Sequence, residues 1–506
     1  MREQKKTVAG AVERIFLILF GSLLIIVTGI CVQKPQHNLI PTRMIAFTLV
    51  WLIILYLGRC ILGFVAGWIK HRKKEKLLDV LLVVFFLVWA LLLFLTGCTA
   101  RCYPHTDFEN VYRAADALAR KQEVDNWVYF SRWTNNRFPM LFLSGLLCAG
   151  YHMGFEDAYY FVLAYQVIHI VITAACLYHL AGSNKTEMSL TNSLTVLMLL
   201  FLFTPVWGNV AFFYTDQLSF GYSIIAYTFV SEAIKGRYTP YAKYALLIAG
   251  GVLWAIAFQI KVTTAIPLMA IAVAVIIRKK YVKQLKALLV FVLAFLLTFA
   301  IGTMRVKVLP CEANVERDSD PILYWVALGL HGDGSHAANE DFAILCEAAG
   351  SKTEREYIVK EKLRREWRQF FDSDHIIAKI RCNFACGDVG ASGYMRFPYK
   401  EGNIVYELIS WDGKFFWKYA CLSTSYLFAL FLLTAIGAFR GAFGNKMNFT
   451  TMTAYVTVIG IMLFLMLWEA QNKQLFNQTG WILLAACHGL LTMGTPKKCF
   501  VGRNKK

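Results

Sequence analysis

Long apolar runs alternate with short polar stretches along most of the chain. A helix that crosses a bilayer needs about 20 predominantly apolar residues. The runs predict twelve such spans, at residues 14–32, 44–66, 77–97, 158–181, 190–206, 217–234, 243–260, 262–277, 286–305, 416–438, 450–469 and 478–494. No cleavable leader is expected, because the first run lacks a small-residue cleavage site and further spans follow it.

Basic clusters beside the runs predict the orientation of the spans. Loops 67–76 and 278–286 are rich in Lys and Arg, which is typical of cytoplasmic loops. An even number of spans must then separate them, so the short apolar run Phe138–Tyr151 is interpreted as a re-entrant or interfacial helix on the outer side. Both termini become cytoplasmic. The segments expected outside are 98–157, 207–216, 306–415 and 470–477.

Composition supports a membrane protein and excludes several other classes. Hydrophobic residues make up 57% of the 506 residues and charged residues only 17%, against about 25% charged in ordinary soluble chains. Disorder, a collagen-like fibre and a disulfide-stapled mini-domain are therefore excluded. The net charge is +19, but segment 306–415 is net −4, with 7 Lys, 7 Arg and 18 Asp or Glu. The excess positive charge lies in the cytoplasmic clusters and the basic tail, so nucleic acid is not an expected partner.

The expected fold is an all-α polytopic membrane protein with about twelve spans, an outer surface or re-entrant helix and a mixed extracytoplasmic loop domain. Four parts follow from the pattern. They are an N-terminal two-helix addition with a basic loop (1–76), a transmembrane core with the first outer loop at 98–157 (77–305), the extracytoplasmic loop domain (306–415), and the C-terminal spans with a basic tail (416–506).

The first outer loop carries two carboxylates directly after the third span. In an extended chain, Asp107 and Glu109 point the same way, so both could face one reacting centre or one divalent cation. Two carboxyl groups close together also raise the pKa of one of them, because like charges repel, and a raised pKa suits a general base. The alternative is that both carboxylates are simply solvated at the end of a span.

A predicted amphipathic helix over Asn110–Ala119 follows, and then the stretch Tyr129–Pro139. This stretch mixes aromatic residues with polar ones that can hold a lipid phosphate and a sugar hydroxyl. The alternative is an ordinary interfacial aromatic belt. The polar candidates are Arg132, Asn135, Asn136 and Arg137.

The order of an outer Asp-x-Glu, a surface helix, a "YF-x-R-x-x-NN" stretch and a Pro-initiated apolar helix resembles the GT-C membrane glycosyltransferases. Within these, the chain is most similar to family 39-like bacterial proteins, relatives of the protein O-mannosyltransferases and of aminoarabinose transferase. The resemblance implies a polyprenyl-phosphate-linked sugar donor used on the outer face. It places the catalytic acid of the first outer loop on Asp107 and secondarily on Glu109, with His105 beside the substrate.

Two further motifs fit this resemblance. Phe212–Ser219 resembles the second outer-loop element of the family and places a second acidic residue at Asp216. Alternatively, Thr215 or Asp216 caps a helix that begins near Leu218. Lys261 lies in an element that resembles "K-P-T", with Val in place of Pro, and suits a donor phosphate. Alternatively, it is a Lys that snorkels at a helix end.

The last two motifs lie at both ends of the large outer segment. The Gly-rich stretch Tyr324–His336 resembles a family element in which His331 and Asp333 contact sugar or acceptor, although a plain turn is the alternative. Trp468–Lys473 resembles "WE-x-x-S-R-Y". Glu469 matches the family and is expected at the substrate, whereas Lys473 replaces an Arg and lacks its bidentate fork. Lys261, Arg132 and Lys473 are thus the expected donor-phosphate contacts.

The resemblance predicts a glycosyltransferase of a bacterial plasma membrane that moves a hexose or pentose to a glycan, lipid or protein acceptor by single displacement, with Asp107 as base and Asp216 supporting it. Membrane lipids are the other expected partners. No cofactor is required, and Asp107 with Glu109 is the candidate site for a divalent cation. The rivals are an O-antigen ligase or polymerase, a lipid-linked glycan flippase or transporter, and a non-catalytic scaffold. The 13 Cys show no CxxC or His-rich zinc spacing, while disulfides between outer cysteines are conceivable.

Overall fold

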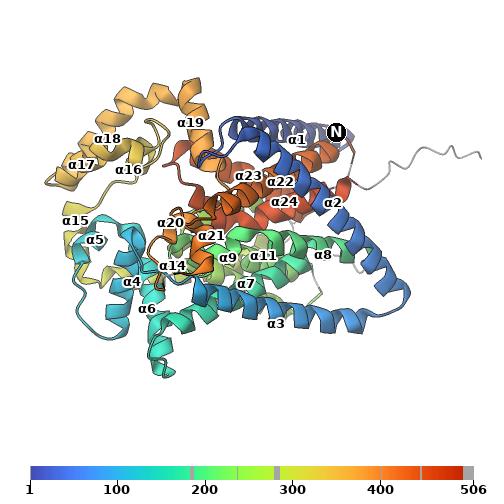
Figure 1. The fold of residues 1–506 in the computed structure, drawn as a ribbon, viewed down its shortest axis with the longest axis horizontal. Helices are drawn as coiled ribbons and strands as arrows, with labels where there is room; N and C mark the ends of the chain where they lie inside the picture. The colour runs from blue at the N-terminus through green and yellow to red at the C-terminus, as the bar shows by residue number, and fades with distance from the viewer. Residues whose placement is uncertain are drawn as a thin grey trace, which may run out of the picture.

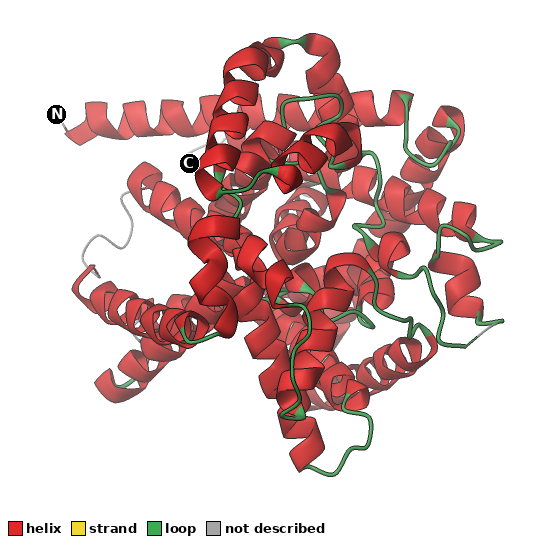
Figure 2. Cartoon of the chain, turned by 90° about the vertical axis from the view of Figure 1, so that its left-hand side faces the viewer, coloured by secondary structure: helices red, strands yellow, loops and turns green. Residues whose placement is uncertain are grey.

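The computed structural model is built of helices and loops (Figure 2). It describes residues 2–182, 187–235, 237–278, 285–400, 402–444 and 447–493. Within these ranges the only β pairing is an isolated bridge between Cys102 and Pro398. The all-α class predicted from the apolar pattern is confirmed. The predicted basic cluster at 278–286 lies largely, and the basic tail entirely, outside the described residues.

Eight helices of the described chain are long and apolar enough to cross a membrane. They are α1 (Arg2–Gln33), α2 (Pro41–His71), α3 (Glu75–Thr99), α7 (Tyr159–Ala181), α12 (Pro240–Ile260), α14 (Leu285–Lys307), α22 (Phe416–Ala442) and α23 (Phe449–Leu467). The four other predicted spans fall on shorter helices: α8 (Glu187–Leu202), α11 (Tyr222–Ile234), α13 (Ala265–Arg278) and α24 (Thr479–Thr492). Every predicted span therefore falls mainly on one helix, but not every one of these helices has full spanning length.

Local sequence explains where two of these helices are shorter than predicted. The run 190–206 breaks at Phe203, and a separate helix, α9 (Thr204–Asn209), begins with a Pro in its first turn. Proline has no N–H to donate to a preceding turn, so it suits a helix start. The run 217–234 is divided by Gly221, whose φ of 78° is left-handed. Only the short α10 (Thr215–Leu218) precedes it.

In the core of the bundle, helices cross at points where small residues let their backbones come close together. A Cβ added to Gly489 of α24 would lie 1.7 Å from the Leu433 carbonyl oxygen of α22. One added to Gly437 of α22 would lie 2.8 Å from the Gly489 Cα. Because association in lipid depends on close backbone approach, these glycines let the two helices pack at the centre of the bundle. Most side chains of α24 are consequently buried.

The two long segments predicted outside lie together at one end of the bundle, on the left of Figure 1, opposite the α2–α3 turn. The first contains α4 (Thr106–Ala119), α5 (Trp127–Arg132) and α6 (Arg137–His152). The second contains α15 (Val315–Asp318), α16 (Leu323–Leu328), α17 (Glu340–Ala348), α18 (Lys352–Glu366), α19 (Ser373–Phe384), α20 (Ala391–Tyr394) and α21 (Ile404–Ile409). The predicted short helix over 138–151 is α6; its depth in a membrane stays a prediction.

Six short 3₁₀ turns link these elements within the described ranges. They are η1 (Thr134–Asn136), η2 (Val262–Thr264), η4 (Pro310–Asn314), η5 (Ala337–Asn339), η6 (Trp367–Phe371) and η7 (Asn472–Gln478). The described cysteines, which are all those up to Cys487, are free thiols.

Candidate functional site

A cavity of about 610 Å³ opens where the first and second outer segments meet the ends of the spans. Its polar wall combines residues from six separate stretches of the chain: Asp107, Asn135, Asn136, Thr215, Lys261, His336, Glu469, Gln471 and Lys473. Its apolar wall comes mainly from the ends of α12, α14 and α23, through Phe258, Ile260, Phe299, Val306 and Phe464. The cavity therefore joins a charged pocket to the apolar surface of membrane helices.

Asp107 lies in the first turn of α4 and accepts a hydrogen bond from the Tyr129 hydroxyl at 2.8 Å. The amide of Asn136 donates to the same hydroxyl at 2.6 Å, and the Tyr214 hydroxyl donates to Asn136 Oδ1 at 3.3 Å. Burial, followed by the nearby Asp107 carboxylate, raises the pKa of Tyr129. The phenol thus stays a donor that fixes one Asp107 oxygen, Oδ1.

The second carboxylate of the motif, Glu109, lies outside the cavity. The expectation that it shares a direction with Asp107 is wrong, because α4 already begins at Thr106. In a helix, residues two apart point to different faces. Glu109 instead forms an ion pair with Arg113 at 3.4 Å. The two carboxylates take separate partners, so the structure gives no support for a shared cation.

Lys261 and Asp216 form an ion pair at the edge of the cavity. Lys261 Nζ lies 3.1 Å from Asp216 Oδ2 and 3.5 Å from the Thr215 hydroxyl. Asp216 is fully buried, and its Oδ1 has no hydrogen-bond partner among the described residues. The capping alternative fails, since the residue before α10 is Tyr214 and no side chain caps that helix. Lys261 does not merely snorkel either, because its charge is balanced by a carboxylate that the local sequence does not reveal.

Glu469 and Lys473 lie on the turn between α23 and α24. Burial raises the pKa of Glu469 to about 7, although the nearby Lys473 partly opposes the shift. Lys473 Nζ lies 5.7 Å from the Tyr214 ring centroid and 5.8 Å from that of Tyr394. Burial lowers the pKa of Lys473, but Tyr394 and the carboxylates around the cavity outweigh this effect and raise it. Lys473 is therefore a half-buried cation that lies beside two aromatic rings.

Comparison with known proteins identifies the family. A family model described as "Conserved hypothetical integral membrane protein" matches residues 6–478. The chain belongs to this family. It is thus an integral membrane protein, as its helices indicate. No curated protein shows significant similarity to it. Among solved structures, the chain is similar to the crystal structure of ArnT from Cupriavidus metallidurans bound to undecaprenyl phosphate, with 13% identity and a TM-score of 0.36 over 81% of this chain and 77% of that chain.

Arg132, which was expected at the donor phosphate, and Arg137, which was expected at the substrate, have structural partners elsewhere. Arg132 pairs with Asp320 and with Glu347, each at 2.9 Å, and does not line the cavity. Arg137 is buried, pairs with Glu312 and donates from Nε to the Phe130 carbonyl at 2.8 Å. Both tie the first outer segment to the second. Their partners lie far along the chain, so sequence spacing could not reveal this role.

The histidines and the aspartate expected at the substrate are also placed outside the cavity lining. His105 Nε2 lies 3.0 Å from the Gly393 carbonyl oxygen. His331 lies 3.7 Å from Glu366, and its side chain is half-exposed. Asp333 accepts from the Ser335 amide at 3.0 Å, which is the plain-turn alternative. Within this Gly-rich stretch, Trp325 and His336 line the cavity instead.

Sequence reasoning missed an aromatic wall. Trp133, Trp325 and Trp468 all line the cavity. The Trp133 and Trp325 ring centroids lie 5.3 Å apart, and those of Trp325 and Trp468 lie 6.5 Å apart with the planes nearly parallel. Each tryptophan lies in one of the motifs discussed above. The presence of a Trp in three separate motifs could therefore have indicated this wall from the sequence. Stacked rings of this kind suit the apolar face of a sugar or an isoprenoid chain.

Proposed function

We propose that this protein is a membrane glycosyltransferase that moves a sugar from a polyprenyl-phosphate donor to an acceptor hydroxyl at the cavity. One observation carries the proposal. A single cavity combines a carboxylate fixed by a phenol, a half-buried lysine beside two aromatic rings, and an apolar wall made by the ends of spans. Such a donor consists of a sugar, a phosphate and an isoprenoid chain. These three parts would contact the carboxylate, the lysine and the apolar wall, respectively.

The donor phosphate is assigned to Lys473, with Lys261 beside it. Lys473 carries a positive charge in a half-buried site, where attraction to an anion is stronger than in water. Lys261 is already balanced by Asp216, so its charge is less available. Arg132 is left out of the donor site, because Asp320 and Glu347 occupy its guanidinium. The isoprenoid chain would follow Phe258, Phe299 and Phe464 towards the lipid.

Asp107 is assigned as the general base. The acceptor oxygen attacks the anomeric carbon while the bond from that carbon to the phosphate oxygen breaks, and the hydroxyl proton passes to Asp107. The leaving polyprenyl phosphate needs no proton, so one base suffices and the anomeric configuration inverts. Tyr129 holds Asp107 Oδ1 and leaves Oδ2 for the proton.

Radiolabelled sugar transfer by membranes tests the assignment. A panel of polyprenyl-phosphate sugars would be supplied to wild type and to Asp107→Asn. General-base catalysis contributes roughly 10²–10⁴-fold, so the variant should lose at least about 100-fold in product formation. Asp125→Asn is the matched control, because Asp125 is an exposed carboxylate of the same outer segment that pairs with Arg113. Full activity of Asp107→Asn would remove Asp107 from the role of base, and no donor use by wild type would remove the proposed function.

A further inference from the structure

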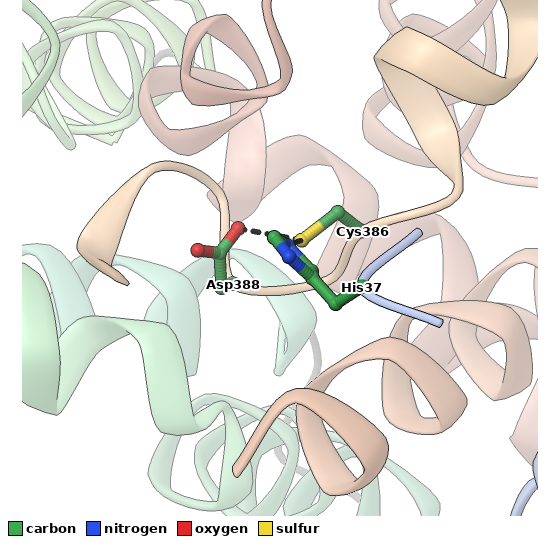
Figure 3. Close-up of side chains that lie close together, drawn as sticks. All are labelled: His37, Cys386 and Asp388. Atoms are coloured by element: carbon green, nitrogen blue, oxygen red, sulfur yellow. Dashed lines mark hydrogen bonds between the residues drawn. The ribbon is translucent and has the colours of Figure 1, made fainter. Parts of the chain in front are cut away.

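Figure 3 shows a second cluster of reactive side chains, none of which lines the cavity. His37 comes from the turn between α1 and α2, whereas Cys386 and Asp388 follow α19, almost 350 residues later. His37 Nε2 lies 3.3 Å from Cys386 Sγ, and the thiol donates to Asp388 Oδ1 at 2.8 Å. All three atoms lie within 4.8 Å of one another. Among the described residues, this is the group of His, Cys and acidic side chains close enough to share one metal ion.

The carboxylate of the cluster is oriented by its own surroundings. Asp388 is 1% exposed. It accepts from the backbone amides of Gly390 and Ser392, each at 3.2 Å, from the Ser392 hydroxyl, and from Asn472 Nδ2 at 2.8 Å. Hydrogen bonds of this kind fix the direction of metal-binding carboxylates. Asp388 is therefore held in place before any ion arrives.

An independent observation points to a missing partner at the same place. The Tyr419 hydroxyl on α22 is buried and has no hydrogen-bond partner among the described residues. Asp388 and Cys386 both lie close enough to Tyr419 to interact with it electrostatically. Buried hydroxyls nearly always have a partner, so a further polar group, such as a metal-bound water, is expected there. Trp411 and Phe416 pack against the His37 ring, with centroids at 5.9 and 4.9 Å, and close the other side.

We propose that His37, Cys386 and Asp388 bind a zinc-type divalent ion through Nε2, Sγ and Oδ1. Sulfur, nitrogen and oxygen in one small site suit zinc better than magnesium or calcium. Tetrahedral zinc with ordinary bond lengths separates its ligand atoms by roughly 3.3–3.5 Å. The Sγ to Nε2 distance already fits, and Sγ to Oδ1 must lengthen by less than about 1 Å to reach that value.

The charge and proton balance also favours a dipositive ion. On binding, the Cys386 S–H bond breaks, an S–metal bond forms, and the proton leaves to solvent. The ion then takes over from that proton the role of bridging Sγ and Oδ1. Thiolate and carboxylate together neutralise the ion, so no net charge is buried. Tyr419 is assigned to the water that completes the tetrahedron.

The position of the site suits a structural role, in which a bound ion would link two segments that are distant in the sequence. It joins the α1–α2 turn to the loop after α19. This loop reaches the cavity, because Asn472, which donates to Asp388, precedes Lys473, and a Cβ on Gly390 would lie 2.6 Å from Lys473 Cβ. The ion would therefore hold the backbone that carries the cavity cation. The zinc site stands on its own observations and does not depend on the proposed transferase activity.

The competing explanation is that the three side chains form a hydrogen-bond network without any metal. Cys386→Ser distinguishes this network from a metal site. Serine keeps a donor to Asp388 but is a poor zinc ligand. His37→Asn is the second variant, because His37 has φ of 58° and Asn tolerates that left-handed backbone. Cys346→Ser is the matched control, since Cys346 is a buried thiol in the hydrophobic cluster of the outer segment. The full-length purified protein would be equilibrated with a small molar excess of zinc, passed over a desalting column and analysed for bound zinc by mass spectrometry.

About one zinc per chain in wild type and in Cys346→Ser, with at least a fivefold loss in Cys386→Ser and His37→Asn, is the expected result. Equal zinc in all four proteins would mean an adventitious ion only and would overturn the proposal. No zinc in wild type would overturn it equally. Where a variant does not fold, Co²⁺ titration of the metal-depleted wild type decides. A saturating thiolate-to-cobalt band in the near ultraviolet supports the site, and its absence overturns it.

Discussion

At the scale of single residues, the cavity contains two differently organised pairs of charges. Lys261 and Asp216 neutralise each other directly. Glu469 and Lys473 share a turn but are not in direct contact, and the acid receives its hydrogen bond from Gln471 instead. Burial without a direct cationic partner explains why the pKa of Glu469 rises to about 7. The charge of the cavity therefore changes within the physiological pH range.

Glu469→Gln should remove a pH dependence of stability. The folded protein holds the Glu469 proton up to pH about 7, while the unfolded chain loses it near the ordinary value of 4.5. The free energy of unfolding of the wild type should therefore fall as pH rises through this window, by roughly 3 kcal/mol at most. Gln keeps the carbonyl that accepts from Gln471 but cannot ionise. Tm of the purified protein, measured at pH 5.5 and 8.5, should fall in the wild type and change less in the variant.

The control for this measurement is Glu123→Gln, an exposed carboxylate of the first outer segment. Its pH profile should match that of the wild type. If Glu469→Gln and wild type lose the same Tm between the two pH values, Glu469 does not titrate in this window and the burial argument is wrong.

The sequence motifs identified several residues that line the cavity, but they did not identify the partners that these residues contact. Asp107, Asn136, Lys261, Glu469 and Lys473 were all singled out from short motifs, and the structure brings them to one cavity. Their partners were not predictable, because Tyr129 and Tyr214 act through contacts between separate segments. The same limit explains the arginines whose ion pairs connect two outer segments. The catalytic and binding roles themselves stay predictions.

At the scale of elements, apolar run length predicted the position of helices better than their ends. A run of apolar residues shows that a segment is buried in lipid or protein, but not where the chain breaks within it. The breaks at Phe203 and Gly221 depend on a following Pro and a left-handed glycine. Packing partners are equally hidden in a run: Val359 of α18 packs in a small cluster of the outer segment itself, with Tyr324 and Phe342.

Gly489→Ala should destabilise the crossing of α22 and α24. The new Cβ would lie 1.7 Å from the Leu433 carbonyl oxygen, and a backbone atom cannot move aside as a side chain can. Overpacking of a core usually costs 1–3 kcal/mol, so a loss of about 3 kcal/mol and a clearly lower Tm are expected. The measurement is thermal unfolding of the purified protein in detergent.

Gly29→Ala in α1 is the matched control, because nothing lies within 4 Å of its added Cβ. It should leave Tm unchanged or raise it slightly, since Ala favours the helix more than Gly does. Equal Tm for Gly489→Ala and wild type would show that the two helices are not packed as closely as described.

At the scale of the whole molecule, parity of the spans predicted which loops share a side, and the structure agrees for the longest two. Segments 98–157 and 306–415 meet at one end, while the α2–α3 turn lies at the other (Figure 1). Successive connections in a helix bundle alternate between its two ends. Counting the spans and locating the basic loops was therefore enough to predict that these two segments share an end. The cavity, by contrast, depends on how both outer segments fold back on the spans, which no single loop specifies.

The positive-inside pattern predicts that the end carrying the cavity faces outward, and accessibility to protease tests this for the whole chain. A cleavage site would be inserted between Gly350 and Ser351, where α17 and α18 are joined, and separately between Arg72 and Lys73 in the α2–α3 turn. Added protease should cut the first site, but not the second, in intact spheroplasts. In inside-out vesicles the result should reverse. Because the two sites lie at opposite ends of one bundle, cutting of the α2–α3 turn alone in spheroplasts would invert the orientation. It would also place the cavity, and any sugar transfer there, on the cytoplasmic side.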